Sequence, residues 1–170
     1  TGDTPLSETV KGYIKEKYQK PGAVFLGVVH RLDRPVSGLV VFARTSKALS
    51  RLNTMFANGE VHKTYWAITQ QPSSCTPQSS PTLLTNWLVR NEQQNKSYAY
   101  DREVPRSKKA MLRYSVIGHG ERYNLVEVQL MTGRHHQIRC QLSHAGMPIK
   151  GDLKYGARRS NPDGSISLMS

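Results

Sequence analysis

The sequence predicts an α+β fold in which strands predominate over helices. Residues 110–116 and 126–130 place apolar side chains at every second position, which is typical of strands buried on one face. The turn signal at residues 118–120, which contain two glycines, separates these stretches. Apolar residues at helical spacing occur in a few other segments, so we expect a sheet with flanking helices.

Two helices are predicted before the middle of the chain. The first begins at residues 4–5, a Thr-Pro pair that suits an N-cap and a first helical position, and it ends at residues 21–22. The second begins at Thr45 or Ser46 and ends at residues 58–59, an Asn-Gly pair. We expect its apolar face to lie in the core: Ala48, Leu49, Leu52, Met55 and Phe56.

A polar loop between two apolar runs holds the first candidate functional residue. The runs at residues 28–29 and 39–43 predict buried strands, and Asp33 lies in the loop between Arg31 and Arg34. A carboxylate on a loop held by strands is a reasonable nucleophile or base. The alternative is a surface Asp that the neighbouring arginines neutralise.

The second half of the chain predicts the rest of the sheet. Residues 61–69 indicate a strand, 70–81 an exposed loop, and 91–109 a hairpin, whereas the apolar segment 83–89 fits either type of element. A short helix then follows, with Ile138 and Leu142 one turn apart and Gly146 at its end. Because we find neither an internal repeat nor a long linker, residues 1–170 are expected to form one domain.

The charge of the chain indicates an anionic partner. Lysine and arginine number 24 against 12 acidic residues, which gives a net charge of +12. Nucleic acid is the simplest such partner, and a group of basic residues predicts phosphate contacts, the alternative being a solvated charged surface. These basic residues are Arg134, Arg139, Lys150, Lys154, Arg158 and Arg159.

The composition also predicts where the protein works. No apolar run approaches the roughly 18 residues of a membrane span, and the first residues do not resemble a secretory signal. Cys75 and Cys140 follow no recognisable spacing, so two free thiols in a reducing compartment are expected. We therefore predict a cytoplasmic protein without a membrane partner, and a monomer.

A metal site is the weaker reading of one group of residues. His136, Cys140 and His144 are spaced at i, i+4 and i+8 and would share one face of a helix. No fourth ligand is evident, and a buried Cys often behaves as a small hydrophobe. The acidic residues are too few and too scattered for two-metal chemistry, and Asp33 has no evident acidic partner for glycosidase chemistry.

Three ordered motifs resemble those of the RluA-type pseudouridine synthases. Residues 30–33 (His-Arg-Leu-Asp) with 37–39 are similar to the signature loop of this family, and residues 63–67 (Lys-Thr-Tyr-Trp-Ala) to its second motif. Residues 130–139 and the tail at 146–156 are similar to its third motif. The resemblance covers residues 26–156 and implies a pseudouridine synthase catalytic domain, with a mixed, mainly antiparallel sheet and flanking helices.

The resemblance implies that the protein isomerises uridine in RNA without a metal or a cofactor. The family breaks the N1–C1′ bond, turns the uracil and rejoins it through C5. Asp33 is then the catalytic carboxylate, which attacks the ribose, attacks the base or removes a sugar proton. Tyr65 packs against the uracil, Arg139 pairs with Asp33, and Ile138 lies under the base. Arg31 occupies the space left by the flipped nucleotide, and we expect further substrate contacts from His30, Arg34, Arg134 and His136.

The chain departs from the family pattern at several points. His135 and Val36 stand where threonine is usual. The family's first strand with its Asn-Lys-Pro-type motif, and its last strand, are not found, so we expect the domain to lack both. Two other classes therefore stay open: a non-catalytic RNA-binding module of the same fold, and a metal-dependent hydrolase that uses His136, Cys140 and His144.

Overall fold

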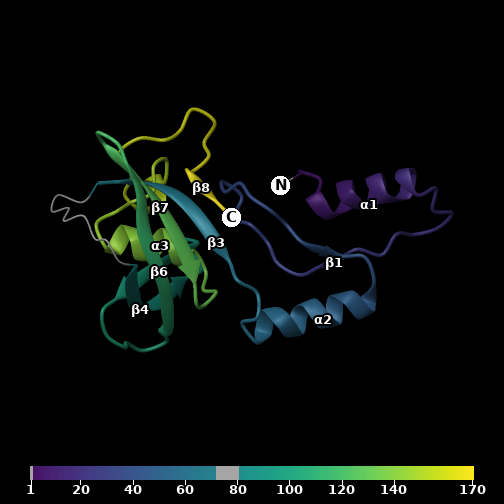
Figure 1. Cartoon of the computed structure of the whole chain (residues 1–170), viewed down its shortest axis with the longest axis horizontal. Helices are drawn as coiled ribbons and strands as arrows, with labels where there is room; N and C mark the ends of the chain where they lie inside the picture. Colours follow the sequence, from purple (N-terminus) through teal and green to yellow (C-terminus); the bar gives the residue numbers. More distant parts are fainter. Residues whose placement is uncertain (1, 72–80) are drawn as a thin grey trace. The chain divides into compact units, whose positions relative to one another are not determined.

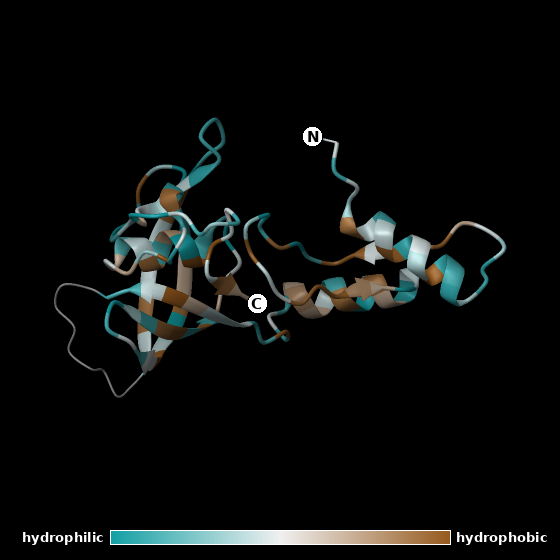
Figure 2. Cartoon of the chain, turned by 90° about the horizontal axis from the view of Figure 1, so that it is seen from above, coloured by the Kyte–Doolittle hydropathy of each residue, from teal (hydrophilic) through white to brown (hydrophobic). Residues whose placement is uncertain are grey.

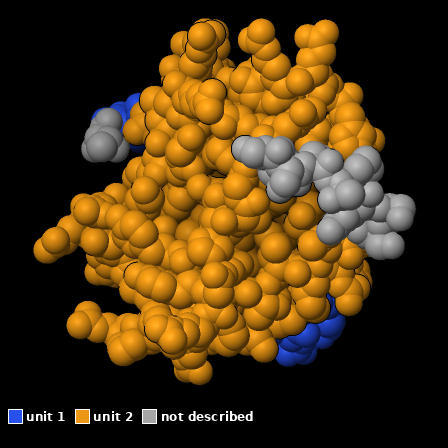
Figure 3. Space-filling view, turned by 90° about the vertical axis from the view of Figure 1, so that its left-hand side faces the viewer, with its two compact units in different colours: residues 1–32, 39–61 blue, residues 33–38, 62–170 orange. Residues whose placement is uncertain are grey.

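The computed structural model describes residues 2–71 and 81–170. Contacts within the chain divide it into two compact units (Figures 1 and 3). Unit 1 comprises residues 1–32 and 39–61, and unit 2 comprises residues 33–38 and 62–170. Most of the predicted 70–81 loop lies outside the described residues, and so does Cys75. Each unit has its own set of internal contacts.

Unit 2 is built on a six-stranded sheet with the order β5-β4-β6-β7-β3-β8. All neighbouring strands in it pair antiparallel. The predicted α+β class with a mainly antiparallel sheet is confirmed, and the segment of undecided type at 83–89 belongs to a strand. The strands are β3 (Thr64–Gln70), β4 (Thr82–Asn91), β5 (Lys96–Tyr100), β6 (Lys108–His119), β7 (Tyr123–Leu130) and β8 (Leu168–Met169).

One face of this sheet forms the core together with helix α3 (Gln137–His144). Alternate residues of β6 and β7 are buried, as the period of two in the sequence predicts, and bands of apolar and polar residues alternate along the strands in Figure 2. Ile138 and Leu142 of α3 join Leu112 and Val126 in one apolar cluster. The helix that carries the end of the third motif, residues 137–139, is therefore fixed against the sheet.

Unit 1 consists of α1 (Leu6–Lys17), the two-stranded pair β1 (Gly27–Val28) and β2 (Phe42–Ala43), and α2 (Ser46–Ala57). The predicted cap of α2 is confirmed, because the Thr45 hydroxyl accepts a hydrogen bond from the Ala48 amide at 3.1 Å. At the start of α1, Pro5 is the N-cap residue rather than the first helical residue.

Two predictions about burial in unit 1 are wrong. The apolar runs around the loop form strands of only two residues each, and Leu39 is 79% exposed. No residue of α2 is buried, although its apolar face was expected to lie in the core. The described part of this unit buries only Ile14, Leu26 and Ala43 among its hydrophobic residues. Two helices and a short strand pair supply too few side chains to cover every apolar run.

None of the helices in the described ranges is both long and apolar enough to cross a membrane.

Candidate active site

The loop that carries Asp33 is held in place by the C-terminal segment of unit 2. The amide of Ile166 donates to the Pro35 carbonyl at 2.9 Å, and the Ser37 amide donates to the Leu168 carbonyl at 3.3 Å. Gly38 adopts a φ of +145°, and a Cβ there would lie 2.5 Å from the Ser170 carbonyl oxygen, so only glycine fits. The loop therefore presents Asp33 from a fixed backbone, with its side chain 37% exposed.

The turn before α3 is fixed by Gln137. Its side-chain oxygen accepts hydrogen bonds from the Thr132 hydroxyl at 2.8 Å and the Arg134 amide at 2.9 Å. Its side-chain amide donates to the Met111 carbonyl of β6 at 3.0 Å. Because these groups are satisfied inside the protein, the turn from β7 into α3 has one stable conformation, and α3 begins at a defined point.

Arg139 of α3 links Asp33 to a second carboxylate. Its Nη1 donates to the Asp33 Oδ2 at 3.2 Å, so the predicted pairing is present in the structure. Its Nε and Nη2 donate to the two oxygens of Asp152 at 2.7 and 2.9 Å. Arg139 is 5% exposed and Asp152 1% exposed. Such a two-pronged contact sets the plane of the guanidinium and aims its remaining edge at Asp33.

Asp152 was not among the predicted site residues, and Arg139 was predicted both to pair with Asp33 and to belong to the phosphate-contacting group. Burial lowers the pKa of the Arg139 guanidinium, but its hydrogen bonds and ion pairs with Asp152 and Asp33 outweigh this and raise the pKa above its usual value. Arg139 is thus an internal cation, not a surface group. In the sequence, Asp152 is a single acidic residue after Gly151 in a turn-rich segment. Without a known partner, such a residue does not indicate a site.

His136 also lies close to Asp33. Its Nε2 lies 3.6 Å from the Asp33 Oδ2, which is beyond hydrogen-bond distance. Its Nδ1 lies 2.9 Å from the Tyr155 hydroxyl, which also accepts a hydrogen bond from the Ser97 amide at 2.8 Å. Tyr155 is 4% exposed, and burial is the main cause that raises its pKa to about 12, so its hydroxyl keeps its proton.

These contacts define the tautomer of His136. Within the described residues, the acceptor in contact with the buried Tyr155 O–H is Nδ1 of His136. If Nδ1 carried the ring proton, the proton of the Tyr155 hydroxyl would have no acceptor. Burial, and then the charge of Arg139, lower the pKa of His136 to about 4, which keeps the ring neutral at pH 7. The single ring proton is therefore assigned to Nε2, on the side of Asp33.

Tyr65 and Ile138 lie in unit 2 with Asp33. Tyr65 comes from β3 and packs, half-buried, against the core, whereas Ile138 is 5% exposed and belongs to the core cluster. Burial, and then the negative charge of Asp33, raise the pKa of the Tyr65 hydroxyl. That hydroxyl is therefore protonated at neutral pH, and its ring is the available surface for an aromatic contact.

The predicted substrate-binding residues are distributed over both units. His30 lies in unit 1, where its Nε2 accepts a hydrogen bond from the Val41 amide at 3.0 Å and its ring stacks on Phe56. Arg31 is exposed in the same unit, whereas Arg34 is exposed on the 33–38 loop of unit 2. Arg134 donates from Nε to the Lys109 carbonyl at 3.0 Å and lines a cavity described below.

The geometry does not support the weaker alternative of a metal-binding helix face. His136 precedes α3, with a left-handed φ of +51°, so it does not share a helical face with the other two residues. The Cys140 thiol donates to the Ser97 carbonyl, and His144 contacts Asp101 at 2.8 Å. Across the described ranges, no group of three or more His, Cys, Asp or Glu residues is placed to hold a metal ion.

Residues 4–144 match the family described as RNA pseudouridylate synthase. Among curated proteins, the chain is similar to the ribosomal large subunit pseudouridine synthase C of Vibrio parahaemolyticus, with 34% identity over 82% of this chain and 42% of the relative. It is also 32% identical to the tRNA pseudouridine synthase C of Vibrio cholerae, over 75% of this chain and 54% of the relative. The chain thus spans about half or less of the length of these relatives.

Solved structures show the same fold. Human RNA pseudouridylate synthase domain containing 4 matches with a TM-score of 0.78 at 23% identity, over 99% of this chain and 74% of that one. Human RNA pseudouridylate synthase domain containing 1 matches with a TM-score of 0.73, over 98% of this chain and 69% of that one. Sequence and fold agree on one conclusion: this chain belongs to the RNA pseudouridylate synthase family.

Proposed function

We propose that the protein converts uridine in ribosomal or transfer RNA to pseudouridine, with Asp33 as the catalytic carboxylate. The observation that carries the proposal is the contact between the half-exposed Asp33 and the buried Arg139, which Asp152 orients. A carboxylate held in this way is available to a nucleotide, while its direction is set by the protein. The names of the relatives support rRNA and tRNA as the substrate class.

The reaction needs the target nucleotide outside its helix. A stacked base is out of reach, so it must be extruded and held in a pocket. We propose that Tyr65 stacks on the extruded uracil beside Asp33, with Ile138 under it, and that Arg31 fills the vacated space. His30, Arg34, Arg134 and His136 are proposed to contact the RNA. The cytoplasmic location and the monomeric state remain predictions.

Tritium release tests the activity directly. When C1′ becomes bonded to C5 of the uracil, the hydrogen at C5 leaves, so RNA labelled with tritium at C5 of uridine releases tritium to water. We expect release from rRNA or tRNA of cells that lack this protein, and the modified positions identify the substrate. RNA binding without release would contradict the proposal and favour the non-catalytic RNA-binding module.

Tyr65→Phe is expected to keep both RNA binding and most of the activity, because it keeps the ring. Tyr65→Ala is expected to lose a stacking contact worth about 1–3 kcal/mol, with a corresponding fall in the rate of tritium release. Single-turnover rates of the two variants at saturating RNA measure this difference. If Phe were as inactive as Ala, the hydroxyl would have a chemical role that stacking does not explain.

Tyr155→Phe is expected to let His136 adopt both neutral tautomers, because it removes the hydroxyl that donates a hydrogen bond to Nδ1. Nitrogen NMR of histidine-labelled protein should show one tautomer at His136 in the parent and a mixture in the variant. The single-turnover rate should fall about tenfold, or about 1.4 kcal/mol. Tyr98→Phe is the control, since it removes an exposed hydroxyl that contacts Gln94. An unchanged tautomer in Tyr155→Phe would contradict the assignment.

A further inference from the structure

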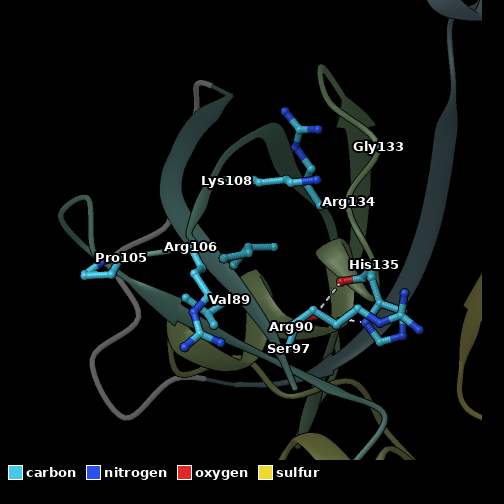
Figure 4. A pocket seen from close by; sticks show the side chains of 10 residues that line it. Val89, Arg90, Ser97, Pro105, Arg106, Lys108, Gly133, Arg134 and His135 are labelled. Carbon is cyan, nitrogen blue, oxygen red and sulfur yellow. Dashed lines mark hydrogen bonds between the residues drawn. The ribbon is translucent and has the colours of Figure 1, made fainter. Parts of the chain in front are cut away.

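We propose that a cationic cavity of unit 2, next to the Asp33 site, binds backbone phosphates of the RNA beside the target nucleotide. We call it the phosphate cavity. The inference rests on the proposed function, because it assumes that the target nucleotide is held at Asp33. The cavity has a volume of about 550 Å³, and Figure 4 shows its lining, which includes Arg90, Arg106, Lys108, Arg134 and His135.

Four permanent cations from separate parts of the chain line the cavity. Arg90 comes from β4, Arg106 from the turn before β6, Lys108 from β6, and Arg134 from the turn before α3. None of the ten lining residues is acidic. Among the residues that the structure describes, Arg90 pairs with the exposed Glu92 at 4.0 Å, which is a weak surface contact. Cations that repel one another in a shared hollow are stabilised by a bound anion.

The hydrogen-bonding capacity of the cavity suits phosphate oxygens. The Nε of Arg134 is used by the Lys109 carbonyl, which fixes the side chain and leaves its terminal nitrogens as donors. Arginine forks and a lysine are the side chains that most often contact phosphates. Leu88, Val89 and Pro105 add apolar surface, and the volume lies within the range of about 300–1,000 Å³ for small-molecule sites, so the hollow accepts more than a bare ion.

Arg106 is held in a conformation that arginine does not favour. Its φ is +62°, and it follows Pro105 in a turn that the Ser107 amide closes onto the Val104 carbonyl at 3.0 Å. The Ser107 hydroxyl also contacts both the amide and the carbonyl of Val104. Glycine or asparagine is usual at such a position in a turn. Strained backbone positions cluster at functional sites, so this turn is consistent with a functional cavity.

The wall of the cavity is also a wall of the Asp33 site. His135 stacks on His136 with ring centroids 3.7 Å apart, and His136 lies 3.6 Å from the Asp33 carboxylate. Ser97 contacts residues of both sites: its hydroxyl contacts His135, and its amide donates to the Tyr155 hydroxyl. Burial, and then the charge of Arg90, lower the pKa of His135, so it is a neutral wall between the cations and Asp33.

This arrangement favours the RNA backbone over other anions. A nucleotide at Asp33 has its neighbouring phosphates close by, and the cavity lies one pair of stacked rings away from that carboxylate. The strand flanking an extruded nucleotide must be held while the base is out of its helix. We therefore assign the phosphate cavity to the phosphates next to the target uridine, which the protein contacts without reading the base.

The test compares two double variants of equal charge. Arg90→Gln with Arg106→Gln removes two cations from the phosphate cavity. Arg113→Gln with Arg122→Gln removes two exposed cations of unit 2 that do not line this cavity. RNA affinity is measured against salt with rRNA and tRNA stem-loops, and circular dichroism confirms that both variants are folded.

We expect the first variant alone to bind RNA about tenfold more weakly at low salt. Its slope of log K against log salt should be flatter by about 1.4–1.8, the value for two lost phosphate contacts. Neutral methylphosphonates next to the target uridine should weaken binding to the parent more than binding to this variant, which keeps only Lys108 and Arg134 in the cavity. Equal slopes in the two variants, or equal sensitivity to methylphosphonates, would overturn the inference. Absence of tritium release by the parent would overturn the proposed function alone, since the binding measurements do not depend on turnover.

Discussion

Asp33→Asn is expected to abolish pseudouridine formation while the fold stays intact. An amide acts neither as a nucleophile nor as a base, so the rate of tritium release should fall about 10³-fold or more. The amide oxygen of asparagine can still accept the hydrogen bond that Arg139 donates to Asp33 at 3.2 Å. The free energy of unfolding in urea should therefore change little.

Asp101→Asn is the matched control for this variant. The Asp101 side chain is 83% exposed and contacts His144 within unit 2, so the same change of atoms occurs away from Arg139. We expect its rate to equal that of the parent. If Asp33→Asn kept a single-turnover rate within about tenfold of the parent, a barrier change of only about 1.4 kcal/mol, Asp33 would not be the catalytic carboxylate.

Arg139→Met is expected to cost both activity and stability, for separable reasons. Activity falls because Asp33 loses the donor that orients it. Stability falls because Asp152, which is 1% exposed, becomes a buried carboxylate without its two-pronged partner. Breaking a buried pair on one side typically costs about 3–5 kcal/mol. Urea unfolding measures this loss, and single-turnover tritium release measures the activity.

Two further variants separate the two effects. Arg139→Met combined with Asp152→Asn should recover part of the stability, because a buried amide costs less than an unpaired carboxylate, and it should stay inactive. Arg139→Lys should keep some activity, because a positive charge remains without the planar fork. If the stabilised double variant showed the single-turnover rate of the parent at saturating RNA, Arg139 would have no catalytic role.

The local patterns of the sequence were sufficient for most of unit 2. Alternating residues such as Leu112 and Val126 are buried in β6 and β7, and the helix around Ile138 and Leu142 forms where its spacing predicts. These elements follow from side-chain periodicity, which is a property of neighbouring residues. The same reasoning predicted the two helices of unit 1 but was wrong about burial there, because an apolar run such as that around Leu39 is buried only if another element covers it.

The residues of the candidate site could be predicted from the sequence, but most of their contacts with one another could not. The motifs that resemble the family placed Asp33, Tyr65 and Arg139 in one site, and the structure adds the contact between Arg139 and Asp33. The spacing of His136, Cys140 and His144 left a metal site open as a weaker alternative, and the geometry does not support it because His136 adopts a left-handed conformation before the helix begins. One backbone angle decided the direction of that side chain.

Residue types and their order thus specified the family, the α+β class and the identity of the candidate carboxylate. Tertiary structure alone decided the partners of those residues. Asp152 holds Arg139, Tyr155 holds His136, and Arg90 lies near Arg134 in the phosphate cavity. These pairs come together through the packing of α3 and the strands. A hydrogen bond or a shared cavity depends on distances of a few ångströms between atoms, and separation along the chain does not encode them.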